Sequence, residues 1–298
     1  MKLQKKSLLA TLATAAVLVG MSSNASAGID VQNWQLNLNA LGVTGVVDTN
    51  INNLAFNGES YVKNSPIAGQ PGMYNSVDTS VIDITQKNGG VPLNLGCGQL
   101  TAYFTGTDLT NTNTGFYTFQ SGTFSVYYNP SIVYGSSSAN HYGSTAGTQI
   151  ATFSVANTGN PMTSGGFINP NGTPTSNGTV TLTGTAPTTL TPSNILLDSN
   201  GNPFNQSILL SFVTTNASVD PSANPNTLSS PNQYTIDPNL VAAFGLAPGT
   251  YNGQGGPNYF ITNGGQFKLQ YAPEPMTVAL FGAGLLAMGW SLRRRSKV

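Results

Sequence analysis

Few side chains in this 298-residue chain could act as a catalytic base or nucleophile. His141 is the sole histidine and lies in a loop-like segment, residues 138–143, so we expect it on the surface. A Ser-His-Asp hydrolase would require His141, but no G-x-S-x-G turn occurs and residues 143–147 have threonine at the centre. We therefore expect no enzymatic activity and no cofactor; a secreted hydrolase using His141 is the least favoured alternative.

Cys97 is the sole cysteine. It could be a nucleophile, an intermolecular disulfide partner or a buried thiol, and we predict the buried, inert thiol. One cysteine and one histidine together cannot supply a Cys₄ or Cys₂His₂ zinc site.

Carboxylates are a further route to chemistry. Asp78 and Asp83 are five positions apart and therefore point to opposite faces of a regular strand. A glycosidase needs two acids that face one cleft, so we predict solvated surface charges instead. The segment with Asp198, Asn200 and Asn202 resembles the start of a calcium loop, but its glycine comes fourth and its twelfth position is Leu209. A turn is favoured, and a calcium site is the alternative.

Tyrosines gather in one stretch of the chain, around a loop rich in Asn and Ser. Aromatic faces beside amides could stack on sugar rings, whereas core packing and plain loop positions are the favoured interpretation. The residues are Tyr127, Tyr128, Tyr134 and Tyr142.

Charge divides the chain into three parts. Basic residues are concentrated at the two ends, and segment 28–275 holds three lysines against all ten acids, a net charge of −7. A basic polyanion-binding surface is thus excluded, and nucleic acid is not an expected partner.

The N-terminal end has the three parts of a secretory signal peptide, residues 1–27. Lysines at positions 2, 5 and 6 precede an uncharged, mostly apolar run, and Ala25-Ser26-Ala27 forms an A-x-A cleavage site. An uncleaved anchor is the alternative, although the run is short for a spanning helix.

The C-terminal end, residues 273–298, begins with Pro273-Glu274-Pro275. Residues 276–292 are uncharged, and as a helix they would reach about 25 Å, which is the short end of what spans a bilayer. Arg293, Arg294 and Arg295 would hold the last turn on the cytoplasmic side and leave the body outside. These features predict a transmembrane helix over 276–292.

Pro-Glu-Pro, a short apolar helix and a terminal arginine cluster together resemble the PEP-CTERM sorting signal, with Ala272 before the motif where the family often has valine. The resemblance covers about the last 27 residues. It implies a Gram-negative bacterium that makes exopolysaccharide, and transient recognition by an exosortase in the inner membrane that removes the tail near residues 273–275. A simple tail-anchored protein is the alternative.

The body, residues 28–272, is predicted to be all-β and β-sandwich-like, because short alternating runs are separated by dense turn signals. One helix is expected over 238–246, capped by Asp237, and a subdivision of the body could fall near residue 160. Two runs suggest turns inside them: 115–128 as a hairpin or bulged strand at Ser121-Gly122, and 259–270 as a hairpin around residues 263–265. The other predicted strands are 34–39, 77–84, 100–104, 149–155, 179–182 and 208–213.

Within the PEP-CTERM group, segments 74–79, 100–107 and 122–130 resemble the flocculation-associated proteins. That resemblance implies an exported surface or matrix protein that supports cell aggregation, floc or biofilm formation. Its expected partners are signal peptidase and exosortase, the inner membrane before processing, and extracellular polysaccharide. The alternative function is that of a carbohydrate-binding module for the matrix polysaccharide.

Overall fold

The computed structural model describes residues 29–111, 113, 116–156, 163–164, 178–185, 194–204, 208–219, 237–246 and 258–271. The chain divides into two units, and these residues belong almost entirely to the unit Asp30–Tyr271. The predicted signal peptide 1–27, the sorting signal 273–298 with its helix 276–292, and the predicted boundary near residue 160 lie outside the described residues. Within the residues that the structure describes, no helix has both the length and the apolar character needed to cross a bilayer.

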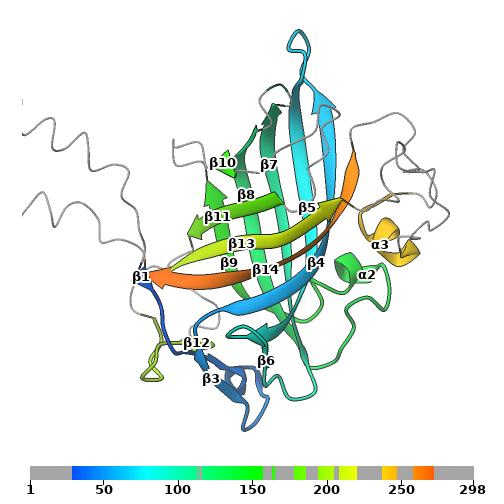
Figure 1. Ribbon diagram of the computed structural model, residues 1–298. Coiled ribbons are helices and arrows are strands. Elements are labelled where there is room, and N and C mark those ends of the chain that lie inside the picture. The colour runs from blue at the N-terminus through cyan, green and yellow to red at the C-terminus, as the bar shows by residue number, and fades with distance from the viewer. Residues whose placement is uncertain are drawn as a thin grey trace, which may run out of the picture. The chain divides into compact units, whose positions relative to one another are not determined.

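One antiparallel sheet dominates this unit (Figure 1), so the all-β prediction is confirmed. Each long strand pairs with the next one along the chain, and the last returns to the first, with Tyr259 opposite Val62 and Phe267 opposite Leu54. The described strands therefore close into a ring, which leaves neither β4 nor β14 as a free edge. In order they are β4 (Leu54–Pro66), β5 (Met73–Lys87), β7 (Gln99–Asn111), β8 (Phe116–Asn129), β9 (Thr148–Ala156), β11 (Gly178–Thr185), β13 (Ile208–Val219) and β14 (Tyr259–Tyr271).

Shorter elements complete the described part. A second, small sheet lies at one end of the ring, and two helical segments lie beside β4 in Figure 1. The short strands of the large sheet are β1 (Ile29–Asp30), β6 (Val91–Pro92) and β10 (Thr163–Ser164); the small sheet has β12 (Leu196–Leu197), β2 (Trp34–Asn37) and β3 (Val47–Ile51); the helical elements are η2 (Leu38–Leu41), α2 (Ala139–Tyr142) and α3 (Pro238–Ala243).

The apolar core fills one half of the ring. Phe267 of β14 contacts Phe124 of β8, on the opposite wall, with ring centroids 5.8 Å apart. Opposite walls thus pack face to face, as the layers of the predicted sandwich would, but they belong to one continuous sheet. Trp34 and Leu36 of β2 join this core from the small sheet. Closure was not predictable from periodicity, because alternation shows which face is buried and not which strands pair.

Two predicted turns resolve as continuous strands. Gly264 and Gly265 pair with Asn57 and Phe56 in an extended strand, so the hairpin predicted around residues 263–265 is wrong. Glycine tolerates a turn but does not require one. In β8 the bulged-strand alternative is confirmed, because the pairing with β7 skips Gln120.

A second apolar cluster lies on the outer face of the ring. Tyr61 of β4 packs on Phe260 of β14, with centroids 5.0 Å apart, and on Phe244, which follows α3. Leu240 and Val241 of α3 are buried in the same cluster. The helix predicted from residue 238 is confirmed with its cap, since the Asp237 side chain accepts a hydrogen bond from the Asn239 amide.

The two ends of the unit meet. Asp30 Oδ2 lies 3.1 Å from Lys268 Nζ, and Asp30 Oδ1 accepts a hydrogen bond from Gln270 Nε2. The Val31 amide donates to the Leu269 carbonyl at 2.9 Å. The hydrogen bond from Gln270 and the charge of Lys268 lower the pKa of Asp30. The first and last described strands are thereby held side by side.

Candidate functional site

A group of polar side chains lines the other half of the ring, beyond the apolar core. Their positions follow from strand parity: Ile82 and Ile84 of β5 face the core, so the even-numbered residues earlier in β5 face the interior as well. Ser76 pairs with Asn64 of β4 and with Asp108 of β7. We call these residues the polar interior cluster: Ser60, Asn64, Ser76, Asp78, Ser80, Asp108 and Thr110.

Hydrogen bonds connect most of this cluster. Ser76 Oγ donates to Asn64 Oδ1, lies 2.9 Å from Thr110 Oγ1, and Thr110 Oγ1 donates to Asp108 Oδ1 at 2.9 Å. Each hydroxyl has only one hydrogen, so in this arrangement the contact between Ser76 and Thr110 has none left. A proton on the Asp108 carboxyl would supply the missing hydrogen by reversing the bond to Thr110.

The two carboxyl groups of the cluster are unusual in their surroundings. Burial and the nearby Asp108 carboxylate raise the pKa of Asp78 to about 7, against an ordinary value of 3.8. Burial also raises the pKa of Asp108, although the hydroxyls of Thr110 and Ser76 oppose the shift. Asp78 is packed by protein on every side and keeps some accessible surface, but its Oδ1 is buried and has no hydrogen-bond partner.

No basic side chain of the described residues offsets these carboxylates. Lys87 pairs with Asp48, and Lys268 pairs with Asp30. Lys63 is exposed, and His141 is exposed on the loop against the outer face. Arginine is absent from segment 28–275 of the sequence. The polar interior cluster thus combines two acids with hydroxyl and amide oxygens and no counter-charge.

Phe104 marks the border between the polar and apolar halves. Its ring lies over Gly106 and Gly122, which face each other on β7 and β8. A Cβ atom at Gly106 would lie 2.6 Å from Phe104 Cζ, and one at Gly122 would lie 3.0 Å from Phe104 Cε2. These two glycines therefore make the room that this aromatic ring occupies.

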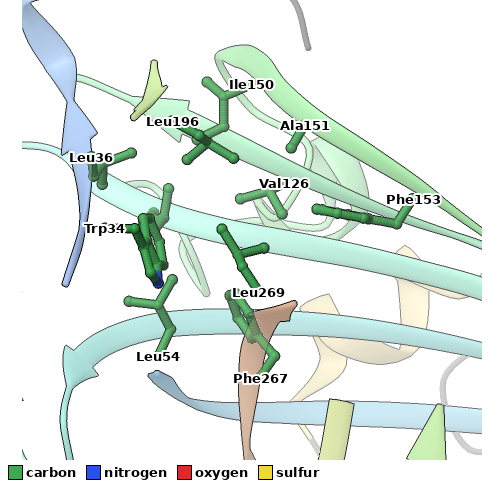
Figure 2. Close-up of a pocket in the computed structure, with 11 residues that line it drawn as sticks. Trp34, Leu36, Leu54, Val126, Ile150, Ala151, Phe153, Leu196, Phe267 and Leu269 are labelled. Carbon is green, nitrogen blue, oxygen red and sulfur yellow. The ribbon is translucent and has the colours of Figure 1, made fainter. Parts of the chain in front are cut away.

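A small cavity in the apolar half is a poorer candidate (Figure 2). Its volume is about 20 Å³, and no polar atom lines it. This is space for about one water molecule, and water needs two or more polar partners to remain in a buried site. Side chains such as Trp34, Phe153 and Phe267 surround it in Figure 2. It is a packing defect of the core and not a ligand pocket.

The prediction for Asp78 and Asp83 was half right. The two do point to opposite faces, but Asp78 is enclosed in the ring and is not a solvated surface charge. Asp83 lies on the outer face, where burial raises its pKa. Sequence reasoning missed Asp108, the acid that accompanies Asp78. The even-numbered parity of β7, set by the buried Leu100, Ala102 and Phe104, was the signal that could have found it.

The four tyrosines predicted to stack on sugars or to pack are not brought into one face. Tyr128 is buried in the core and donates to the Leu95 carbonyl. Tyr134 and Tyr142 pack against the outer cluster, where their rings meet edge to face 5.2 Å apart. Tyr127 is half-buried on the outer face and donates to Gln149 Oε1 at 3.3 Å. Packing therefore accounts for three of the four.

His141 is exposed, as predicted, and its ring stacks on Tyr103 with centroids 4.3 Å apart. Asn140, His141 and Tyr142 all have φ between 48° and 63°, a left-handed conformation that costs non-glycine residues about 1–2 kcal/mol each. Surrounding contacts hold this turn: Tyr142 Oη donates to Asp237 Oδ2 at 2.6 Å, and Ser144 Oγ donates to the His141 carbonyl.

Two further predictions concern single features. Cys97 is exposed, so the buried thiol predicted for it is wrong; Gly96 beside it has φ +64°, typical of a turn at the surface. The turn predicted at residues 198–202 is confirmed, because Asp198 Oδ1 accepts hydrogen bonds from the Asn200 and Asn202 amides. In the described residues no group of three or more His, Cys, Asp or Glu side chains is placed to hold a metal ion.

The processing residues Ala25, Ala27, Pro273, Glu274 and Pro275, and the orienting residues Arg293, Arg294 and Arg295, lie outside the described residues. Comparisons of the chain with protein-family models, with curated proteins and with solved structures each found no match.

Proposed function

We propose that this chain is an exported, exosortase-processed protein of the cell surface or extracellular matrix. Signal peptidase removes residues 1–27, the tail helix 276–292 holds the chain in the inner membrane, and an exosortase cleaves near Pro273-Glu274-Pro275. The freed body associates with exopolysaccharide and supports cell aggregation, floc or biofilm formation. The body itself does no catalysis.

The observation that carries this proposal is the junction of the two ends of the body. Asp30, Lys268 and Gln270 join the first and last strands, so the segments that precede and follow the body leave from neighbouring strands. Removal of both terminal signals then cuts outside the closed ring and breaks none of its strand pairings. A body processed at both ends requires such an arrangement.

The test is mass spectrometry of the protein recovered from the producing bacterium, with a strain that lacks residues 273–298 for comparison. We expect a mature form that begins at Gly28, ends near residue 273 and is found in the matrix fraction. The truncated strain should release its protein without matrix retention and aggregate less. Recovery of the intact 298-residue chain from the cytosol would overturn the proposal.

A carbohydrate-binding body is the second candidate, and one observation favours it. The outer face carries Tyr103 with His141 stacked upon it, and Tyr127 with Gln149 on the adjoining strands. Aromatic faces beside amides and hydroxyls suit sugar rings. The strained left-handed turn that holds His141 over Tyr103 is typical of a functional site.

This candidate is tested by affinity electrophoresis in a gel that contains the producer's own polysaccharide. We expect the protein to be retarded, Tyr127→Ala to lose most of the retardation, and Tyr127→Phe to keep it. Ile132→Ala, which removes a side chain that is 75% exposed elsewhere on the surface, is the control. Equal migration with and without polysaccharide would eliminate this function.

A further inference from the structure

We propose that the polar interior cluster binds one hard divalent cation, of which Ca²⁺ is the best fit, between Asp78 and Asp108. This site is independent of the proposed export and matrix association. It also differs from the calcium site considered at residues 198–202, where the Asp198 carboxylate is occupied by backbone amides.

The first argument is charge. Asp108 is 5% exposed, and Asp78 is enclosed beside it. Buried carboxylates are normally paired with a base or bound to a metal, because burial of an unpaired charge costs several kcal/mol. Every lysine of the described residues is either engaged with another aspartate or exposed. The compensating charge must therefore come from outside the polypeptide.

The second argument is the unpartnered oxygen. Asp78 Oδ1 is buried and accepts no hydrogen bond, although a carboxylate oxygen can accept two. Such an oxygen inside a polar cluster marks the position of something that the polypeptide does not provide. Part of the Asp78 side chain remains accessible, so a small ion has a route to it.

The third argument is the identity of the neighbouring atoms. The cluster offers only oxygen: carboxylates of Asp78 and Asp108, hydroxyls of Ser76 and Thr110, and the amide oxygen of Asn64. Ca²⁺ takes six to eight oxygen ligands in flexible geometry, whereas Zn²⁺ favours nitrogen and sulfur. With two acids where tight sites use more, we expect an affinity in the range of extracellular modules, about 10⁻⁴–10⁻³ M.

The experiment measures thermal unfolding of the full-length chain, first in EDTA and then with excess CaCl₂. We expect the unfolding midpoint to rise by roughly 5 °C at a hundredfold excess over the dissociation constant. Asp78→Asn and Asp108→Asn should abolish the rise. Asp83→Asn is the matched control: it makes the same change on the outer face of the same strand and should respond as the wild type does.

Misfolding is separated from loss of the ion by the EDTA measurement. Asparagine is isosteric with aspartate and carries no charge, so Asp78→Asn should unfold in EDTA at or above the wild-type midpoint at pH 8. A rise that persists in Asp78→Asn would overturn the proposal, as would a wild-type chain that does not respond to Ca²⁺. A response lost only in Asp198→Asn would place the ion at residues 198–202 and would also overturn it.

Discussion

At the scale of the residue, Asp78 has the most perturbed environment among the carboxyl groups described here. Its pKa in the folded state is about 7, and in the unfolded chain it returns to the ordinary value of 3.8. The folded state therefore binds more protons than the unfolded state between these values. Stability is greatest at low pH and falls as the pH rises from about 4 to 7.

We expect Asp78 to lower the free energy of unfolding by about 2 kcal/mol between pH 5.5 and pH 8, and Asp78→Asn to remove this dependence. Urea unfolding in EDTA at both pH values measures it. The neighbouring Asp108 has a raised pKa as well, so a smaller slope of the same sign should remain in the variant. Identical slopes for wild type and Asp78→Asn would contradict the assignment.

Tyr142 offers a second test at this scale. Its hydroxyl donates to the Asp237 carboxylate at 2.6 Å and thereby joins the left-handed turn of α2 to the start of α3. Tyr142→Phe should reduce the free energy of unfolding by about 1–3 kcal/mol, since a hydrogen bond to a charged group is lost. In Tyr127→Phe the lost bond is 3.3 Å long and exposed, so we expect almost no change.

Sequence reasoning reached some of these residues and missed others for one reason. Alternation in β5 and β7 identifies two faces, but polar side chains such as Ser76, Asp78 and Asp108 stand on the enclosed face, where apolar residues are the usual occupants. A polar residue at an inward position looks the same in sequence as one at an outward position. Only the parity set by Phe104 and its neighbours separates the two cases.

At the scale of the element, the crossing of Phe104 over Gly106 and Gly122 controls how β7 and β8 pack. Gly106→Ala would place a methyl group 2.6 Å from Phe104 Cζ, so the ring must move. We expect a loss of about 1–3 kcal/mol in urea unfolding, with partial recovery in the double variant with Phe104→Leu. Gly264→Ala is the control, because its Cβ would lie 3.4 Å from Asn57 Oδ1. An equal loss in the control would attribute the effect to glycine itself.

Most described strands were predictable because their core residues recur with period two. The capped helix was predictable as well, since Asp237 and Pro238 have direct local roles at its start. Local signals failed where glycine was taken for a turn, as at Gly264 and Gly265. There, the partner strand β4 decides the conformation, and it lies far away in the sequence.

At the scale of the whole molecule, Phe267 connects opposite walls of the ring. It contacts Phe56 and Phe124, with centroids 6.5 Å and 5.8 Å away. Phe267→Ala should reduce the free energy of unfolding by about 3–5 kcal/mol and keep a single cooperative transition, because the walls share one core. Calorimetry checks both points. Ile132→Ala, at a 75% exposed position, should be neutral; two separate transitions in Phe267→Ala would show that the walls unfold independently.

The pairing of β14 with β4 also bears on the kinetics of folding. Thr262 contacts Glu59, a residue 203 positions earlier, so closure brings together parts of the chain made at very different times. Contacts this remote give slow folding, since the entropy of a long loop is lost before the contact forms. Until residues 259–271 emerge, the growing sheet has two unpaired borders. The chain therefore stays in a loosely ordered, transportable form throughout most of its synthesis.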